Sequence, residues 1–316
     1  MNNYYLLLTT LVILLIACNS DKNETVATQV NSVIEEGAQQ TETYLPLLMG
    51  KKVGLVTNQT SVIFNNKARS NYTHIVDSLL SLDINIKKVF APEHGFRGTA
   101  DAGETVKNSV DTKTNLPIIS LYGKNKKPTL EQLSDIDVLV FDIQDVGVRF
   151  YTYISTLHYV MEAAAEANIP IIVLDRPNPN AQYIDGPMLE PEFTSFVGMH
   201  PVPLVYGMTI GEYGEMINGE GWLINKIQAD LTVIPIKNYS HTYDYDLPIR
   251  PSPNLPNAQS IHLYPSLGFF EGTTINAGRG TEFQFQRYGA PWFPETDFSY
   301  TPEPNFGSKN PKHIGE

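Results

Sequence analysis

Short, mostly apolar runs alternate with longer amphipathic stretches from residue 53 onward. The apolar runs are typical of buried strands and cover residues 53–57, 87–91, 117–121, 138–143 and 170–174. Helical patterns separate them: apolar positions at helical spacing over 68–82, a possible capping box at the start of 129–133, and three consecutive alanines within 152–168. This alternation predicts a doubly wound, mostly parallel, Rossmann-like α/β sheet over residues 44–198.

The pattern changes after residue 198, where prolines and glycines become frequent. Thr209 and Glu212 fit a capping box that opens a helix reaching residue 218, and residues 231–236 are typical of a strand. Long irregular runs follow, and their aromatic side chains argue against disorder. We predict a second, smaller α/β or α+β subdomain over residues 199–316, which closes over one edge of the sheet.

The N-terminal residues predict a targeting segment. Residues 1–18 are largely apolar, too short for a comfortable membrane span, and end in Leu-Ile-Ala-Cys at Cys18, the chain's only cysteine. This segment resembles a bacterial lipoprotein signal peptide whose cleavage leaves Cys18 as a lipidated N-terminus; an uncleaved N-terminal anchor is the alternative. Residues 19–43 are polar and predict a flexible tether.

Asp21 and Glu24 resemble the acidic surface-export signals of Bacteroidetes lipoproteins. We therefore expect an exported lipoprotein that is held at the membrane through Cys18. Its expected location is the periplasm or the outer-membrane surface of a Gram-negative, Bacteroidetes-like bacterium.

Composition and the lack of nucleotide motifs narrow the partner classes. The net charge is −12 over 316 residues, and the sequence has no basic stripe to neutralise phosphates, so we expect no nucleic-acid partner. The first predicted strand is not followed by Gly-x-Gly-x-x-Gly, and the sequence has no Walker motif. We therefore expect no nucleotide cofactor, and no other cofactor is indicated.

Polar residues follow each predicted strand, and the carboxyl ends of parallel strands meet at one edge of a sheet. The most informative group is Glu93, His94 and Arg97, which follow a predicted strand within five residues and have glycines between them. The other strand ends supply Asn58, Asp142, Asp145, Asp175 and Arg176. These side chains predict a ligand site at that edge.

Ten motifs in order along the chain resemble one known family. They cover residues 54–58, 92–97, 101–104, 141–153, 175–179, 206–212, 251–256, 270–273, 278–281 and 289–292. On these motifs the chain resembles the NamZ-type exo-β-N-acetylmuramidases, the YbbC-like bacterial glycoside hydrolases. The resemblance implies release of N-acetylmuramic acid from the non-reducing end of peptidoglycan fragments, during cell-wall turnover and recycling.

The resemblance also implies a site in the cleft between the two parts, and Glu93 matches the family's proposed catalytic glutamate. Family members continue well beyond the motif that ends at Trp292, so it further implies a C-terminally truncated chain with an incomplete second subdomain.

Glycoside hydrolysis generally uses two carboxyl groups. We assign Glu93 as the general acid and His94 as a group that orients it or binds sugar hydroxyls. Glu104, Asp142 and Asp145 remain open as the second carboxylate.

Muramic acid carries a lactyl carboxylate, which an arginine binds well through paired hydrogen bonds. The candidates for this contact are Arg97, Arg149, Arg176 and Arg279. The other candidate substrate-binding residues are Asn58, Tyr151, Tyr206, Glu271 and Asn276. For Asp175, Arg176 and Glu271, structural loop contacts are an equal alternative.

Two other interpretations remain open. Glu93, His94, Asp142 and Asp145 are residue types that bind metals, although the sequence has no His-Glu-x-x-His and we predict no metal. The second interpretation is a surface lipoprotein that binds glycan or cell-wall fragments without turning them over.

Overall fold

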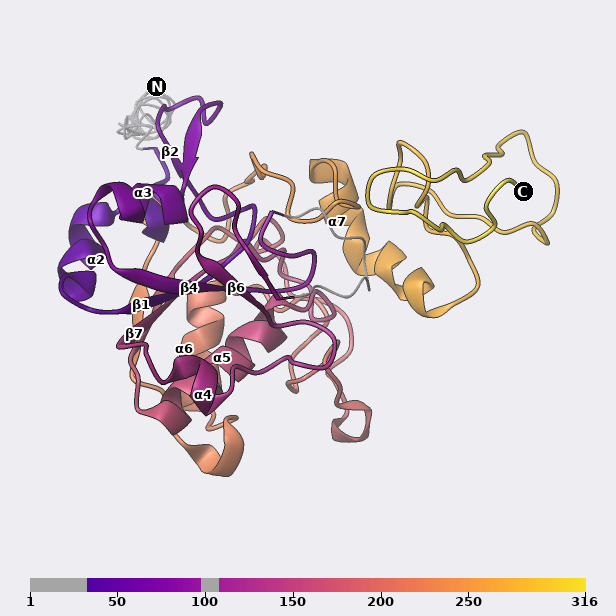
Figure 1. Cartoon of the computed structure of the whole chain (residues 1–316). Coiled ribbons are helices and arrows are strands. Elements are labelled where there is room, and N and C mark those ends of the chain that lie inside the picture. The colour runs from indigo at the N-terminus through magenta and orange to yellow at the C-terminus, as the bar shows by residue number, and fades with distance from the viewer. Residues whose placement is uncertain (1–32, 98–107) are drawn as a thin grey trace, which may run out of the picture. The chain divides into compact units, whose positions relative to one another are not determined.

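The computed structural model describes residues 33–97 and 108–316 (Figure 1). Cys18, Glu104 and the first part of the predicted tether lie outside the described residues. Among the residues that are described, no helix is long and apolar enough to cross a membrane.

A seven-stranded sheet forms the centre of the fold. Its order is β5-β6-β4-β1-β7-β8-β9, and all pairs are parallel except β5 with β6. The strands are β1 (Val53–Thr57), β4 (Ile86–Ala91), β5 (Ser109–Val110), β6 (Pro117–Ser120), β7 (Val138–Asp142), β8 (Ile171–Leu174) and β9 (Leu231–Ile234). The six parallel strands follow the Rossmann order, with the reversal between β1 and β7. The predicted doubly wound sheet is confirmed.

Helices cover both faces of this sheet (Figure 1). One face carries α2 (Thr41–Leu48) and α3 (Ile75–Ser81), and the other carries α4 (Leu130–Leu133), α5 (Tyr153–Ala167) and α6 (Ile210–Gly219). Alternate strand residues serve the two faces: Val140 belongs to the core beneath α3, and Phe141 to the core beneath α5. Burial on both faces explains why the strands are continuous apolar runs in the sequence.

The predicted capping boxes at Thr129 and Thr209 are confirmed at the starts of α4 and α6. The helix predicted over 68–82 begins only at Ile75. The residues just before Ile75 belong instead to β3 (Tyr72–His74), which pairs with β2 (Val62–Phe64) in a separate antiparallel ribbon.

The predicted domain boundary at residue 198 does not separate two structures. Strand β9 pairs with β8, and α6 packs on α5 and β9, so residues 199–234 complete the first sheet. The remaining segment, 235–316, is fully described and contains α7 (Ala258–Leu267) and η4 (Gly268–Gly272) but no strand. Its many prolines and glycines interrupt regular pairing, and isolated bridges such as that between Asn276 and Gly289 form there instead. Short turns of helix η2 (Pro191–Phe193) and η3 (Ile224–Lys226) complete the list.

The C-terminal part of the predicted tether is folded. The turn η1 (Gly37–Gln39) packs so tightly on the sheet that a Cβ on Gly37 would lie 2.5 Å from the backbone of Asp175 and Ile234. The Gly37 N–H donates to the Asp175 carbonyl at 2.8 Å. One of the polar residues of the predicted tether, Glu36, is buried and belongs to an ion network.

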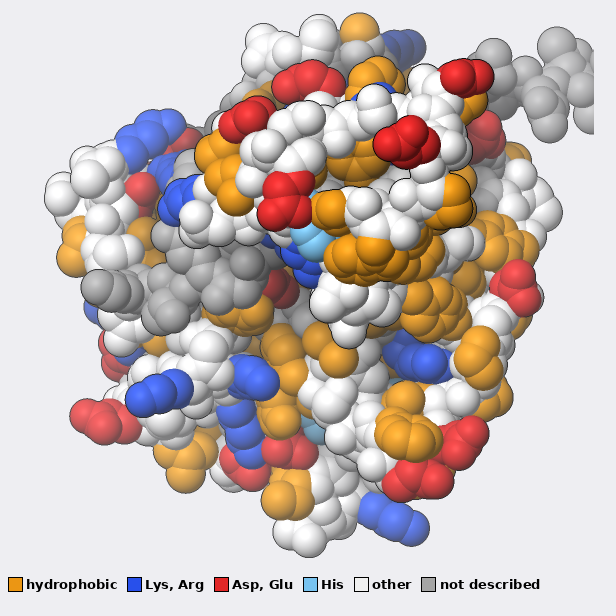
Figure 2. Space-filling view, turned by 90° about the vertical axis from the view of Figure 1, so that its right-hand side faces the viewer, with side chains coloured by type: hydrophobic (Ala, Val, Ile, Leu, Met, Phe, Trp, Pro, Cys, Tyr) orange, Lys and Arg blue, Asp and Glu red, His pale blue; other side chains and the backbone are white. Residues whose placement is uncertain are grey.

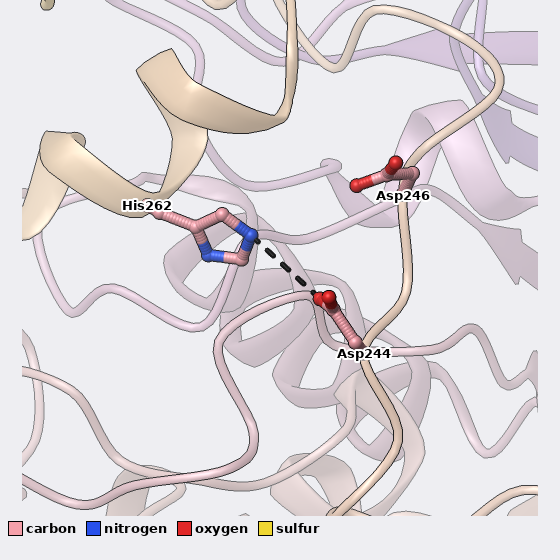
Figure 3. Close-up of side chains that lie close together, drawn as sticks. All are labelled: Asp244, Asp246 and His262. Carbon is pink, nitrogen blue, oxygen red and sulfur yellow. Dashed lines mark ion pairs between the residues drawn. The ribbon is translucent and has the colours of Figure 1, made fainter.

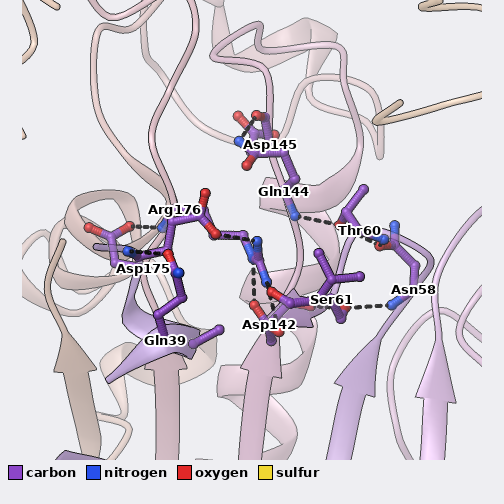
Figure 4. A network of polar contacts seen from close by, with 12 residues as sticks. Gln39, Asn58, Thr60, Ser61, Asp142, Gln144, Asp145, Asp175 and Arg176 are labelled. Carbon is purple, nitrogen blue, oxygen red and sulfur yellow. Dashed lines mark hydrogen bonds and ion pairs between the residues drawn. The ribbon is translucent and has the colours of Figure 1, made fainter. Parts of the chain in front are cut away.

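That network is centred on Arg176, which is 3% exposed. Its guanidinium donates to both carboxylate oxygens of Asp142, at 2.5 and 3.0 Å (Figure 4). It also donates to Glu36 Oε2 at 3.0 Å and to the Val62 carbonyl at 3.2 Å. One side chain thus joins β7, β8, β2 and the segment before η1.

The neighbouring Asp175 anchors α6. Its carboxylate accepts from the Gly211 N–H at 2.7 Å and the Thr209 hydroxyl at 2.8 Å, both at the first turn of that helix. A carboxylate is favourable at a helix N-terminus. Burial nevertheless raises the pKa of Asp175 to about 7.

We expect Arg176→Ala to lower the free energy of unfolding by about 3–5 kcal/mol, because it leaves Asp142 and Glu36 buried without their cation. Denaturant unfolding followed by circular dichroism measures this loss. Lys113→Ala is the control, because Lys113 pairs with Asp77 at an exposed position, and it should cost less than about 1 kcal/mol. Equal, small losses in both variants would show that the network does not hold the fold.

Candidate active site

Glu93 stands directly after β4, in a tight turn. Pro92 ends the strand, and the Gly95 N–H donates to the Pro92 carbonyl at 3.0 Å. His94 and Gly95 both have positive φ, 67° and 76°, a conformation that glycine adopts without strain. The turn leaves Glu93 half-buried, whereas His94 is buried.

The start of α5 holds Glu93 in place. The Thr152 hydroxyl donates to Glu93 Oε2 at 3.0 Å, and the Tyr153 hydroxyl lies 3.5 Å from the Glu93 carbonyl. Tyr153 in turn receives a hydrogen bond from Asn58 Nδ2, at the end of β1, at 3.0 Å. Glu93 therefore lies close to the point where the strand order reverses, the usual ligand site of such sheets.

A second carboxyl group comes from the C-terminal part of the chain. The hydroxyl of Tyr264 in α7 donates to Glu271 Oε2, in η4, at 3.4 Å. Burial raises the pKa of Tyr264, and the Glu271 and Glu93 carboxylates raise it further. Tyr122, which follows β6, also has its pKa raised by burial, then by Glu93 and Glu271. Both carboxylates thus act on the same two tyrosines.

The electrostatics distinguish Glu271 from an ordinary surface glutamate. Its side chain is 35% exposed, and Arg279 Nη1 lies 3.5 Å from Glu271 Oε1. Burial raises the pKa of Glu271; the Arg279 cation lowers it, and the Glu93 carboxylate raises it. Two carboxyl groups and one guanidinium therefore form a single electrostatic group, which we call the Glu93–Glu271 site.

Asp142 and Arg176 have a different role from the predicted one. They pair with each other at 0% and 3% exposure, and the pair is completed by Glu36. This geometry favours the structural alternative for Arg176 and corrects the expectation that Asp142 is a catalytic candidate. Asp175 also makes structural contacts, at the start of α6.

Asp145 is buried next to Tyr206. Its Oδ2 accepts from the Tyr206 hydroxyl and, at 2.7 Å, from the Gly147 N–H, whereas no described residue bonds its buried Oδ1. Burial raises the pKa of Asp145 to about 7. Tyr206 is itself 3% exposed, so the internal bond replaces the predicted contact with sugar.

Of the four predicted arginines, Arg279 alone lies beside the carboxyl pair. Arg97 donates to Asp111 at 2.9 and 3.0 Å, and Arg149 donates to the Pro187 and Val202 carbonyls. Arg176 belongs to the buried network. Asn276 Nδ2 donates to the Arg279 carbonyl at 3.0 Å, so this predicted binding residue positions Arg279.

Two further predicted contacts are internal. Tyr151 is 7% exposed, and its hydroxyl donates to the Pro251 carbonyl at 2.8 Å. Asn58 bonds Tyr153 and Thr60. Both side chains are therefore bonded within the protein and not directed at a substrate.

Sequence reasoning missed three neighbours of the two glutamates: Tyr122, Thr152 and Tyr264. Tyr122 directly follows a predicted strand end, and Thr152 lies at the start of a predicted helix, so both positions carried a signal. Tyr264 carried none, because α7 lies in a segment predicted as irregular.

A separate group of possible metal ligands lies on the surface. Asp244, Asp246 and His262 have ligand atoms within 4.8 Å of one another, and it is the one such group among the described residues (Figure 3). All three are exposed, and His262 bonds Asn180 Oδ1 at 3.1 Å and lies 4.0 Å from Asp244. These contacts fit a surface ion pair. The metal set considered from the sequence is not available as such, because Asp142 is paired with Arg176.

The fold and the site together define an α/β protein with two carboxyl groups near the switch point of a Rossmann-like sheet. Residues 53–259 match the family model described as exo-beta-N-acetylmuramidase NamZ, N-terminal, and residues 262–304 match its C-terminal counterpart. The chain belongs to this family. The two family models meet within the first turn of α7, beyond the predicted boundary at 198.

Characterised and solved relatives agree with this assignment. The chain is 48% identical over 263 residues to peptidoglycan beta-N-acetylmuramidase NamZ of Bacillus subtilis, covering 82% of this chain and 61% of that protein. Two DUF1343 family crystal structures from Bacteroides fragilis are similar. One has a TM-score of 0.80 at 44% identity, over 90% of this chain and 74% of that one. The other has 0.73 at 38%, over 83% and 66%.

Proposed function

We propose that this protein is an exo-acting β-N-acetylmuramidase that releases N-acetylmuramic acid from the non-reducing end of peptidoglycan fragments in cell-wall recycling. The observation that carries the proposal is the Glu93–Glu271 site, in which two carboxyl groups from distant parts of the chain act on shared tyrosines. Membership of the family and the activity named for the Bacillus subtilis relative support the same function.

The two carboxyl groups divide the chemistry between them. Burial raises the pKa of Glu271, and we assign it as the acid that gives its proton to the glycosidic oxygen as the C1–O bond breaks. Glu93, which accepts a hydrogen bond from Thr152, acts as the carboxylate that attacks C1 or activates the water that does so. This division is an alternative to the expectation from sequence, in which Glu93 was the acid.

Arg279 supplies selectivity for muramic acid. Its guanidinium is 24% exposed, and Nη2 donates to the Gly307 carbonyl at 3.2 Å. A cation at this place is suited to the lactyl carboxylate, which glucosamine lacks. The lactyl carboxylate of the substrate would then either replace Glu271 as the partner of Arg279 or bind Arg279 together with Glu271.

We further propose export as a lipoprotein anchored through Cys18, at the periplasmic face or the cell surface. The apolar segment that ends in Leu-Ile-Ala-Cys supports it.

Glu93→Gln and Glu271→Gln should each lower kcat for a chromogenic N-acetylmuramic acid β-glycoside by about 10²-fold or more, because each removes one of the two carboxyl groups. Glu166→Gln is the control, since Glu166, near the end of α5, pairs with Lys127, which precedes α4. Its kcat should equal that of the unmodified protein, with melting temperatures measured for all three. A Glu271→Gln protein with full activity would remove Glu271 from the mechanism.

Arg279→Ala should lower the preference for the muramic acid glycoside over the glucosamine analogue by about 10-fold, through a higher KM for the former. Arg97→Ala, which removes the pair with Asp111 and the contact with the Phe96 ring, should leave the ratio unchanged. If Arg97→Ala lowers the ratio and Arg279→Ala does not, the arginine that binds the lactyl carboxylate is Arg97.

Cys18→Ser should move the protein from the membrane fraction to the soluble fraction and abolish labelling by radioactive palmitate in its host. Palmitate labelling that persists in this variant would refute lipidation at Cys18.

A further inference from the structure

A polar cavity of about 310 Å³ lies apart from the two glutamates, between the segment that leads into α7 and the C-terminal residues. The residues that line it are Arg250, Pro256, Asn257, Glu282, Gln284, Asn305 and Phe306. None of them contributes to the chemistry described above. The volume is at the lower end of the range for small-molecule sites, which suits a ligand of one ring.

Gln284 is the most informative of these residues. It is 5% exposed, yet none of the residues in the described part of the chain is hydrogen-bonded to its side-chain amide. Asn305, on the same wall, has a buried Oδ1 that no described residue bonds. Buried polar groups are nearly always paired, and leaving one unpaired costs stability. Since Gln284 lines the cavity, its carbonyl and NH₂ groups are available to a ligand there.

The cavity is also lined by two charged side chains, Arg250 and Glu282. Within the described ranges, neither of them forms an ion pair with any residue. A guanidinium, a carboxylate and a primary amide together offer donors and acceptors to a neutral ligand that is rich in hydroxyls. A carboxylate in the wall disfavours a polyanion such as a nucleotide.

Phe306 supplies the aromatic ring of the wall and is 54% exposed. Figure 2 views the molecule from the side on which α7 and the C-terminal segment lie, and hydrophobic side chains form separate groups among acidic ones on this face. A ring beside hydrogen-bonding groups is the combination that a pyranose needs, because its C–H face is apolar and its rim is polar.

The cavity is joined to the Glu93–Glu271 site by one peptide. Gly307, next to Phe306, accepts from Arg279 Nη2 at 3.2 Å and from Asn254 Nδ2 at 2.6 Å. A Cβ on Gly307 would lie 2.5 Å from Pro253, so this contact requires glycine, whose φ here is 88°. Arg279, which is proposed to bind the terminal sugar, thus contacts the residue next to Phe306, whose ring lines the cavity.

We propose that the cavity binds a second N-acetylhexosamine residue, the one linked to the terminal muramic acid on its leaving-group side. This inference rests on the proposed function, because that function places the muramic acid at Arg279. Gln284 and Arg250 bind the hydroxyl and acetamido groups of the second sugar, Glu282 accepts from its hydroxyls, and Phe306 stacks on its apolar face.

The test is a binding measurement that needs no turnover. In a Glu93→Gln background, calorimetry compares N-acetylmuramic acid with the disaccharide N-acetylmuramyl-β-1,4-N-acetylglucosamine. Gln284→Leu and Arg250→Ala should each weaken disaccharide binding by about 10-fold or more and leave monosaccharide binding unchanged. Gln228→Leu, at an exposed position near β9, is the matched control and should change neither.

The outcomes separate this inference from the proposed function. Disaccharide affinity that is the same in both cavity variants and in the control overturns the inference, even if the protein hydrolyses muramic acid glycosides. Cavity-dependent disaccharide binding by a protein with no hydrolytic activity upholds it and overturns the function. Arg250→Ala keeps the test decisive if Gln284→Leu does not fold, because Arg250 is exposed.

Discussion

The buried contact between Arg176 and Asp142 is the interaction on which the rest of the structure depends. It ties the ends of β7 and β8 together at the edge of the sheet that carries the site, and it draws Glu36 and the residues before η1 into the same place. The loop that leaves β7 at Asp142 leads to Thr152 and Tyr153, which hold Glu93. The buried pair of Arg176 and Asp142 therefore helps to set the position of Glu93, which is only half-buried. Breaking such a pair is costly because the remaining charge stays buried.

The Glu93–Glu271 site depends on a second junction, between the sheet and the segment after residue 234. Tyr151 donates to the Pro251 carbonyl, and Gln59 Nε2 donates to the carbonyls of Arg250 and Pro251 at 3.1 and 3.0 Å. These bonds fix the segment that leads to α7, and α7 leads directly to Glu271. The sheet positions one carboxyl group and the C-terminal segment positions the other. Each carboxylate is near enough to affect the tyrosines beside the other, so neither part alone makes the site.

The sequence was sufficient for the sheet and for the loop that carries Glu93, because both follow local rules. Apolar runs such as 138–143 predict buried strands, and the shared edge of a parallel sheet predicts that polar residues after them converge. The capping boxes at Thr129 and Thr209 are equally local. What failed depends on partners far apart in the chain. Nothing near Arg176 shows that it points inward to Asp142 and Glu36, so it was placed with the arginines that could bind substrate. Glu36 was assigned to a tether for the same reason. The pairing of β9 with β8, which moves the boundary beyond residue 198, and the closeness of Glu271 to Glu93 are likewise tertiary facts.

The most direct test of the account is the pH dependence of kcat/KM for a chromogenic N-acetylmuramic acid β-glycoside, measured for the unmodified protein and for Glu271→Gln. Glu271 can act as the acid only while it holds its proton, so the profile of the unmodified protein should follow the protonation of Glu271. Its rate should fall on the alkaline side as Glu271 loses its proton. In Glu271→Gln, the remaining activity should be low and should lack that alkaline fall. A Glu271→Gln protein that keeps both the normal rate and the alkaline fall would contradict the claim that these two carboxyl groups work together.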